Sequence, residues 1–489
     1  MKVLFIDIDT LRPDRMSCYG YERKTTPNMD EIANDGVVFE NYYCSDAPCL
    51  PSRAALVSGM FGIHNGAVGH GGTAADMSLY GSTRSFRNQN DTNNLFNTFR
   101  SAGFYTASIS SFAERHSSFW FNAGFNETHN VGDGGMESGE KVIPIALDWL
   151  DKNNDNDNWF LHLHIWDPHT PYRAPEDFGE PFNKDEVKTW ITEEEFKKHL
   201  KHTGPHGANE INMFDDNEDK KYPRHPGKIL TYNEMKNFQN EYDRSVNYSD
   251  YLIGQVLDKL RTYGIYEDTA IIITSDHGEN MGELGLYGEH ATADHPTCHI
   301  PMLIKWPGAK ANHRDIGLHY NIDLAPTIAE LLNVEIKDNW DGTSYSGSLM
   351  ADTDTGHECI ILSQLAHVCQ RSVIFGDWLY IRTYHDGYHL FDDEMLFNLK
   401  CDPYEQNDIK AEYPEIVAKG AKYIFDWVDK QMKKSSQQID PLWTVISEGG
   451  PFHAIDYPFE KYLERLRNTG RADGAEKLVE KYPQNLKND

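Results

Sequence analysis

The sequence predicts an α/β protein with a mostly parallel central sheet that is covered by helices on both faces, and a smaller α+β domain at the C-terminus. Short buried strands alternate with helices along most of the chain, as parallel βαβ units require. Polar residues follow directly after several of these strands. Because parallel strands end at one edge of their sheet, we expect a functional site at that edge.

Apolar runs of strand length define the predicted sheet. They are Lys2–Ile8, Val37–Tyr43, Tyr105–Ile109, Trp159–Ile165 and residues 269–274. Polar or turn-forming residues follow these runs, and the last run is rich in β-branched side chains, which is typical of buried strands.

Helices are predicted between the strands from their caps and their apolar spacing. Thr26 and Pro27 suit the N-cap and first turn of a helix that extends through Ile32. A second helix over residues 94–102 ends at a glycine. Residues 242–263 carry apolar side chains at helical spacing and are followed by a glycine, which predicts a third helix.

Two regions depart from this alternation. Residues 176–228 are polar and charge-rich and contain several prolines, which predicts an irregular insertion. Nearer the C-terminus, short strands precede a helix over residues 414–433. We therefore expect an α/β domain over residues 1–357 and an α+β domain with its tail over residues 358–489. The insertion and the tail beyond Pro441 are expected to shape the pocket.

The composition excludes several classes of function. The 489 residues carry 46 Lys and Arg against 76 Asp and Glu, a net charge of −30, so we expect neither nucleic-acid nor membrane-surface binding. No apolar run is long enough to span a membrane. The chain begins directly with a strand, and its seven cysteines contain no CxxC pair. These features favour reduced thiols and a cytoplasmic protein.

The strongest local motif is Cys49-Leu50-Pro51-Ser52-Arg53. Pro51 and Ser52 are typical of the first turn of a helix, so free backbone N–H groups would face an anion bound beside Cys49. Arg53 lies one turn into that helix, where its guanidinium can hold negatively charged oxygens. The alternative is a helix that starts at a proline and leaves Cys49 as an ordinary reduced thiol.

The Cys-x-Pro-Ser-Arg motif resembles the signature of the type I sulfatases, which belong to the alkaline phosphatase superfamily. Further blocks similar to that family occur before and after this motif. In chain order they are Asp9-Thr10-Leu11-Arg12-Pro13-Asp14, Trp166-Asp167-Pro168-His169-Thr170-Pro171-Tyr172, Thr274-Ser275-Asp276-His277-Gly278-Glu279 and Leu396-Phe397-Asn398-Leu399. Several ordered blocks are more specific than any one of them. The resemblance implies an alkaline-phosphatase-like fold and a sulfuric ester hydrolase.

The resemblance also implies two cofactors. Cys49 would be oxidised by a maturation enzyme to formylglycine, whose hydrate is the nucleophile of the family. Asp9, Asp276 and His277 would bind a divalent metal ion together with the modified Cys49. Such an oxygen-rich set favours Ca²⁺, with Mg²⁺ and Mn²⁺ as alternatives.

The chain departs from the family pattern at three positions. Many members have a second aspartate where this chain has Thr10, and Asp7, on the same strand face as the expected metal ligand, is a candidate substitute. Two lysines that would bind sulfate are also missing, and Glu289 stands where one of them belongs. Arg115, or else His295, is expected to supply the missing positive charge to the substrate.

Histidines are the expected acid–base residues. By resemblance, His169 fits the family's sulfate-binding histidine and would act as the base. His290 or His116 would protonate the leaving oxygen, while Arg53 supports the nucleophile. His162 and His164, on the strand that precedes His169, are expected to be packed and hydrogen-bonded.

The leading hypothesis is hydrolysis of a sulfate ester on a small substrate. A sulfated mono- or disaccharide fits a cytoplasmic location better than a polymer does. The first alternative is a phosphonate or phosphate ester hydrolase of the same superfamily. Measuring turnover of an aryl sulfate and of an aryl phosphonate ester side by side would distinguish it from a sulfatase. The second alternative is a non-catalytic protein that binds sulfated glycans after loss of the lysines, and it would bind sugar without releasing sulfate.

Overall fold

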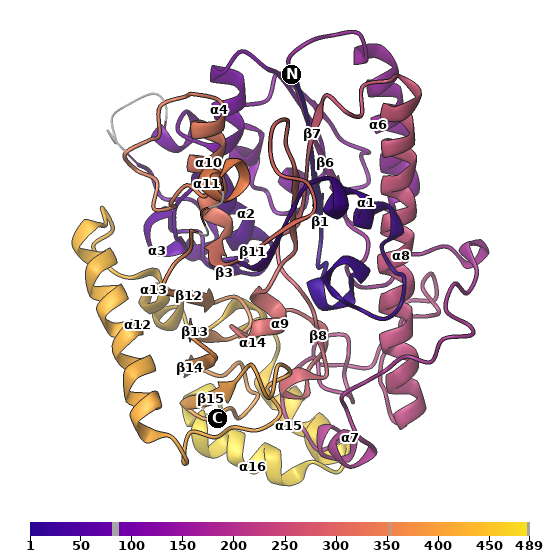
Figure 1. Ribbon diagram of the computed structural model, residues 1–489. Helices are drawn as coiled ribbons and strands as arrows, with labels where there is room; N and C mark the ends of the chain where they lie inside the picture. The colour runs from indigo at the N-terminus through magenta and orange to yellow at the C-terminus, as the bar shows by residue number, and fades with distance from the viewer. Residues whose placement is uncertain (81–87, 352, 354, 487–489) are drawn as a thin grey trace.

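The computed structural model of the chain describes residues 1–80, 88–351, 353 and 355–486 (Figure 1). Within these ranges, the larger sheet has eight strands in the order β11-β2-β10-β7-β1-β6-β4-β5. The strands are β1 (Lys2–Ile8), β2 (Val37–Tyr43), β4 (Tyr105–Ile109), β5 (Glu127–His129), β6 (Trp159–Ile165), β7 (Thr269–Ser275), β10 (Met302–Lys305) and β11 (His313–Tyr320). Neighbouring strands pair in parallel except around β10, which is antiparallel to β2 and β7. The predicted mostly parallel sheet is confirmed.

Helices cover both faces of this sheet (Figure 1). One face packs against α1 (Pro27–Asp35), α6 (Gly139–Asn153) and α8 (Tyr232–Thr262), and the other against α2 (Cys49–Ser58), α4 (Leu95–Ser101) and α10 (Leu324–Leu331). Alternate residues of β1 point to opposite faces, so Val3 and Phe5 join one hydrophobic cluster while Leu4 and Ile6 join the other. Burial on both faces is the reason why the strand reads as an unbroken apolar run.

A second sheet lies beside the first and has the order β15-β14-β13-β12-β3. Its strands are β3 (Asp46–Ala47), β12 (Cys359–Gln364), β13 (Cys369–Phe375), β14 (Trp378–His385) and β15 (Glu394–Asn398). The short β3 comes from the N-terminal part of the chain and pairs in parallel with β12. The residues just before Cys49 are therefore fixed to a sheet whose other strands come from the C-terminal part.

The insertion is irregular, as predicted, whereas the third predicted helix is longer than predicted. Residues 176–228 contain α7 (Glu193–His199) and short turns, as the prediction of an irregular insertion requires. The helix predicted from residue 242 belongs to α8, which begins earlier, at Tyr232. Its first turns carry Met235 and Phe238 at the same apolar spacing, and a capping box formed by Thr231 and Glu234 fixes the start.

The remaining helices are mostly short, except α12, and most of those near the C-terminus lie around the second sheet. They are α3 (Gly62–Asn65), α5 (Phe112–Arg115), α9 (His295–Cys298), α11 (Ser346–Met350), α12 (Pro414–Lys434), α13 (Pro441–Ser447), α14 (Phe452–Ile455), α15 (Phe459–Asn468) and α16 (Ala472–Lys481), with a two-stranded ribbon of β8 (Asn280–Met281) and β9 (Tyr287–Glu289). The C-terminal helices, gold to yellow in Figure 1, lie at the same end of the molecule as the second sheet. Among the described residues, no helix combines the length and apolar character needed to cross a membrane.

Candidate active site

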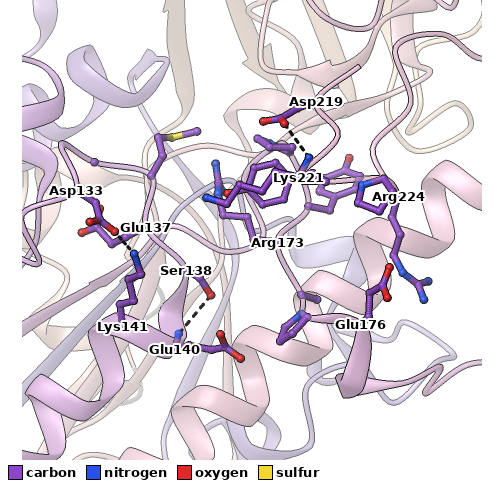
Figure 2. A pocket seen from close by; sticks show the side chains of 18 residues that line it. Asp133, Glu137, Ser138, Glu140, Lys141, Arg173, Glu176, Asp219, Lys221 and Arg224 are labelled. Atoms are coloured by element: carbon purple, nitrogen blue, oxygen red, sulfur yellow. Dashed lines mark hydrogen bonds and ion pairs between the residues drawn. The ribbon is translucent and has the colours of Figure 1, made fainter. Parts of the chain in front are cut away.

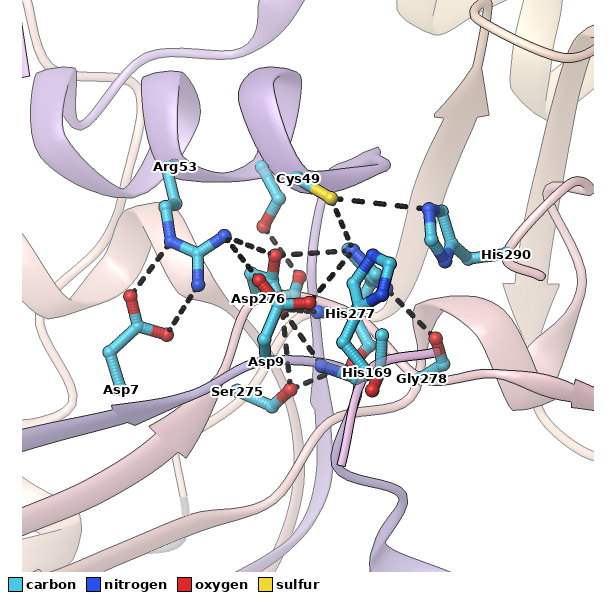
Figure 3. Close-up of polar contacts among 12 residues, drawn as sticks. Asp7, Asp9, Cys49, Arg53, His169, Ser275, Asp276, His277, Gly278 and His290 are labelled. Atoms are coloured by element: carbon cyan, nitrogen blue, oxygen red, sulfur yellow. Dashed lines mark hydrogen bonds and ion pairs between the residues drawn. The ribbon is translucent and has the colours of Figure 1, made fainter. Parts of the chain in front are cut away.

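Two neighbouring parallel strands bring the first site residues together. Strands β1 and β7 pair in register, with Ile8 opposite Ser275. Asp9 and Asp276 therefore leave the sheet side by side at its carboxyl edge, where the sequence predicts the site. The helix α2 begins above this edge, and its first residue is Cys49 (Figure 3).

A compact cluster forms from the four residues expected to bind metal. One ligand atom each from Asp9, Cys49, Asp276 and His277 lies within 4.8 Å of the others, and all four side chains are buried. The His277 Nε2 atom is 3.1 Å from Cys49 Sγ and 3.1 Å from Asp276 Oδ2. It is also 3.8 Å from Asp9 Oδ1. The topology thus unites residues that are far apart in the sequence.

The donor set of this cluster fits a divalent metal ion. Asp9 Oδ1 is buried and has no hydrogen-bond partner, which is unfavourable for a carboxylate oxygen unless a cation or water binds it. His277 Nδ1 donates to the Gly278 carbonyl oxygen over 2.8 Å, so its Nε2 faces the cluster. Although burial opposes it, Asp276 raises the pKa of His277 well above its usual range, so an ion would bind in exchange for the Nε2 proton. Two carboxylates and one imidazole are suitable ligands for such an ion.

Arg53 joins the carboxylates beneath the cluster. Its Nε and one terminal nitrogen donate to the two Asp7 oxygens over 2.8 and 3.1 Å. Its other terminal nitrogen donates to Asp9 Oδ2 over 3.1 Å and also to Asp276 Oδ2. Burial alone would lower the pKa of the fully buried guanidinium, but the three carboxylates raise it on balance. Asp7 thus serves as the bidentate partner of Arg53 rather than as a replacement at Thr10.

The Cys49 thiol is buried and uncharged at neutral pH. Burial raises its pKa to about 12, and the neighbouring Asp9 carboxylate acts in the same direction. The helix start is anchored by Ser52, whose hydroxyl donates to the Asp276 carbonyl oxygen over 2.6 Å. An unmodified Cys49 is therefore a poor thiolate nucleophile in this position.

His290 lies on the other side of Cys49. Its Nε2 is 3.9 Å from Cys49 Sγ, and its ring centroid is 3.9 Å from that of His277. The same Nε2 is 2.7 Å from the Glu289 carboxylate. Burial lowers the pKa of His290 to about 4 although Glu289 opposes this shift. A neutral imidazole is thus held between a carboxylate and the reactive position.

His169 faces the same space from the segment after β6. Its Nδ1 donates to the Thr170 carbonyl oxygen over 2.6 Å, which leaves Nε2 as the acceptor nitrogen. Its ring centroid is 5.5 Å from that of His290. Burial lowers the pKa of His169, so the ring is neutral near pH 7.

At the end of helix α5, the two predicted site residues His116 and Arg115 have different surroundings. The ring of His116 lies 4.9 Å from that of Phe112 and 5.2 Å from that of His70. The Arg53 guanidinium also lies over the Phe112 ring, 4.8 Å from its centroid, so Phe112 lies in contact with both His116 and Arg53. Burial lowers the pKa of His116 to about 3, and the positive charge of Arg53 acts in the same direction. Arg115 is exposed on the helix surface, with its aliphatic stem packed on a glycine of a neighbouring loop.

The contacts of His164 and His295 were not indicated by the sequence. His164 is packed and hydrogen-bonded, as expected, but the partner of its Nε2 is Arg53, which donates to it over 2.9 Å. The register of β1 with β6, which sets His164 opposite Asp7, is the reason. The ring of His295 instead stacks on that of His299 with centroids 4.6 Å apart, and its Nδ1 lies 3.0 Å from the Tyr43 hydroxyl.

A cavity of about 810 Å³ opens beside the segment that carries His169 (Figure 2). It is lined by residues of both charges, among them Lys141, Glu137 and Arg173. Arg173 connects the cavity to the site, because it donates to the His169 carbonyl oxygen over 2.9 Å. A volume of this size is suited to a small ligand.

Comparison with known proteins gives consistent results along the chain. The sequence profile of the family described as Sulfatase matches residues 2–334. A choline-sulfatase of Rhizobium meliloti is 24% identical, over 94% of this chain and 93% of that protein. An N-acetylglucosamine-6-O-sulfatase of Bacteroides thetaiotaomicron is 24% identical, over 91% of this chain and 89% of that protein.

Solved structures share the fold over most of the chain. A protein in complex with its substrate, D-glucosamine-2-N,6-O-disulfate, superposes with a TM-score of 0.67 and 18% identity, covering 90% of this chain and 99% of that one. The phosphonate monoester hydrolase of Agrobacterium radiobacter superposes with a TM-score of 0.66 and 18% identity, covering 88% and 95%. These similarities establish the fold, two sheets with their helices, and they do not identify the substrate.

Proposed function

Because the chain belongs to the sulfatase family and is therefore a sulfuric ester hydrolase, we propose that it works through a formylglycine made from Cys49 and a divalent metal ion. The observation that carries this proposal is the buried cluster in which Asp9, Cys49, Asp276 and His277 offer ligand atoms within 4.8 Å of one another. A maturation enzyme, with an external oxidant, would convert the thiol to the aldehyde.

The two groups supply charge and nucleophile at the same place. When bound, the metal ion supplies positive charge to the ester oxygens, and the formylglycine hydrate supplies the attacking oxygen. Asp9, Asp276 and His277 would hold the ion together with the modified residue. Ca²⁺ is our preferred ion because carboxylates outnumber the imidazole in this set, and Mg²⁺ and Mn²⁺ are the alternatives.

Arg53 keeps the carboxylates in position before the substrate arrives. Its guanidinium bonds to Asp7, Asp9 and Asp276 at the same time. A buried cation that is fixed in this way needs little reorganisation during the reaction, which is the condition under which electrostatic stabilisation is most effective. We therefore assign Arg53 to positioning the metal ligands and to supporting the nucleophile.

Histidines handle the protons in this proposal. His290 would donate to the leaving oxygen from its imidazolium form, which the Glu289 carboxylate favours, and its Nε2 lies between Glu289 and the Cys49 side chain. His169 would accept the proton that is released when sulfate departs, since its Nε2 is an acceptor. His116 is the second candidate for the acid, and Arg115 would attract the anionic substrate from the exposed surface of α5.

The proposed substrate is a sulfated mono- or disaccharide. A relative named for a sulfated amino sugar aligns over most of the chain, and a structure with the same architecture holds a disulfated glucosamine. The polar, mixed-charge cavity beside His169 has the size for such a ligand. The cysteines, all free in the structure, support a reducing compartment such as the cytoplasm.

The experiment compares the wild type with Cys49→Ala after co-expression with a formylglycine-generating enzyme. Intact-mass measurement should show the modification in the wild type alone, and only that protein should release sulfate from aryl sulfates and defined sulfated sugars. Asp276→Asn and exhaustive chelation should each lower turnover by orders of magnitude. Full activity of a protein with unmodified Cys49 would end this mechanism, and faster turnover of aryl phosphonates would favour the phosphonate hydrolase.

A further inference from the structure

Beyond sulfate-ester hydrolysis, three histidines form a second cluster close to Cys49. They are His70 in the loop after α3, His367 in the turn between β12 and β13, and His453 in α14. One ligand nitrogen from each lies within 4.8 Å of the other two. Three segments that are remote in the sequence thus place three imidazoles around one point.

The spacing of the nitrogens is close to that of a metal-binding triad. His70 Nδ1 and His453 Nε2 are 2.9 Å apart, and the His367 ring lies 4.1 Å from the His453 ring, centroid to centroid. Two nitrogens bound tetrahedrally to one zinc ion at 2.0–2.1 Å lie about 3.3 Å apart. A small adjustment of the rings would therefore admit an ion.

The three imidazoles are in the form that binds metal. Burial holds the pKa of His70 and of His367 well below the usual range and lowers that of His453 to about 4. Each ring is thus neutral at pH 7 and keeps a lone pair. His367 Nδ1 is also buried without a hydrogen-bond partner, so this nitrogen is available to an ion. His70 Nδ1 and His453 Nε2 share a hydrogen bond, which a bound ion would replace, with the proton of His70 then on its Nε2 atom.

Backbone contacts hold the three segments together. The His453 N–H donates to the Ala366 carbonyl oxygen over 3.1 Å. The Thr73 N–H donates to Glu448 over 3.2 Å, which ties the loop of His70 to the tail. These contacts do not use the imidazoles, so the three side chains are already positioned before an ion binds. Binding would therefore cost little conformational entropy.

A carboxylate connects this cluster to the active site. Glu289 Oε1 is 3.7 Å from His367 Nε2 and 2.7 Å from His290 Nε2. A carboxylate behind a metal-binding imidazole orients the ring and makes it more basic. The same Glu289 is the residue that replaces a family lysine, so its negative charge would stabilise a cation in this region.

We propose that His70, His367 and His453 bind a second metal ion, a transition metal such as Zn²⁺, separate from the ion of the Asp9 cluster. A donor set of imidazoles alone suits Zn²⁺, Ni²⁺ or Cu²⁺ and disfavours Ca²⁺ and Mg²⁺. Three protein ligands leave a coordination position for water or for an oxygen of the substrate. The side chains of His70 and His453 are only half-buried, so an ion can reach them.

The test counts bound Zn²⁺ in full-length protein that carries no histidine tag. The first site is disabled by combining Cys49→Ala with Asp276→Asn, and zinc is measured after equilibrium dialysis. We expect one equivalent in this background, and a loss of at least tenfold in zinc affinity when His70→Gln or His453→Gln is added. His129→Gln, which changes a half-buried histidine of β5 outside the cluster, is the matched control and should retain one equivalent.

A second measurement guards against misfolding. Zn²⁺ should raise the melting temperature of the background protein, and this rise should disappear in the His453→Gln variant while its melting temperature without metal stays close to that of the background. Co²⁺ should give the visible absorption of a tetrahedral site in the background alone. No zinc binding in the background, or binding that survives both histidine substitutions, would overturn the proposal, and neither result bears on Cys49 chemistry.

Discussion

At the residue scale, the site depends on one buried guanidinium. Arg53 is the positive charge among the buried carboxylates of Asp7, Asp9 and Asp276 (Figure 3). Burying several carboxylates without a counter-charge is strongly unfavourable. Arg53 therefore has two functions, because it makes the metal-free site foldable and it sets the orientation of two metal ligands.

The stability role of Arg53 can be measured with Arg53→Met. Without metal, we expect this variant to lose about 3–5 kcal/mol of unfolding free energy in urea titrations, because three buried carboxylates lose the guanidinium that they share. Ca²⁺ should stabilise the variant more than it stabilises the wild type, since the ion replaces part of the lost charge. The control is Arg382→Met, which removes a partly exposed pair with Glu394 and should cost less than about 1 kcal/mol. Equal effects of the two variants would contradict this assignment.

Arg115 is the proposed substitute for a missing family lysine. We expect Arg115→Ala to lower kcat/KM by about tenfold, which is about 1.4 kcal/mol, chiefly through KM because the side chain is exposed and acts on the bound anion. Steady-state kinetics at two salt concentrations measure the effect, and the loss should shrink at high salt. Arg100→Ala, at an exposed position on α4, should leave kcat/KM unchanged. An unchanged kcat/KM in Arg115→Ala would assign substrate charge recognition to other groups.

The sequence predicts the residues at strand ends better than those that depend on register. Asp9 and Asp276 follow apolar runs, and β1 and β7 pair so that both lie at one edge. The contact between Arg53 and His164 could not be predicted, because it requires the pairing of β1 with β6. The cluster of His70, His367 and His453 joins loops and a tail helix, where no periodic pattern indicates which segments meet.

At the element scale, buried strands were easier to predict than strand direction or helix length. The apolar run of β10 does not reveal that this strand is antiparallel to its neighbours, because burial on both faces gives the same composition in either direction. The start of α8 was placed too late, at Tyr242, although Met235 and Phe238 extend the apolar spacing and the capping box at Thr231 and Glu234 is visible in the sequence. Long α8 matters for the site, since Tyr242 donates to the Thr10 carbonyl oxygen over 2.6 Å.

The capping box of α8 supports a prediction about stability alone. Thr231→Ala should lower the unfolding free energy by about 1 kcal/mol, because the N–H of Glu234 loses its acceptor. The cap lies three turns from Tyr242, so kcat should stay unchanged. Chemical denaturation and steady-state kinetics on the same preparation measure both quantities. Thr262→Ala, near the end of the helix where the hydroxyl donates to the Asp258 carbonyl oxygen, should have a smaller effect on stability, and a loss of kcat in Thr231→Ala would contradict the expectation.

At the scale of the whole molecule, buried neutral histidines govern the response to acid. Burial lowers the pKa to about 3 or 4 in several histidines outside the active site, namely His199, His202, His225, His299 and His385. In the unfolded chain their pKa returns to about 6.5. The unfolded state therefore binds more protons between about pH 6.5 and pH 4, and stability falls as the pH falls through this window.

We expect the free energy of unfolding to be clearly lower at pH 5 than at pH 7, with uptake of protons on unfolding. Among the described residues, eight buried or half-buried carboxyls act in the opposite direction because burial raises their pKa, to about 6 in Asp46 and Asp294 and to about 7 in Asp250, the others being Asp167, Glu241, Asp243, Glu279 and Glu405. Although burial opposes it, neighbouring carboxylates raise the pKa of His64, His277 and His357, which act in the same direction as these carboxyls. Burial lowers the pKa of fourteen histidines in all, so the opposing groups reduce the effect without reversing it. Urea titrations of the metal-free protein at the two pH values measure the difference, and equal or greater stability at pH 5 would show that the carboxyls dominate.

The short strand β3 has a consequence for the order of events during protein synthesis. It ends two residues before Cys49 and pairs with β12, so the segment that leads into Cys49 is fixed by a partner strand made about 300 residues later. At about 5–20 residues per second, the ribosome needs about 15–60 s to produce that partner. During this interval the Cys49 segment emerges without the strand that fixes it. Translation thus leaves the maturation enzyme a defined time in which to reach the thiol, and slower translation of the C-terminal half should increase the modified fraction.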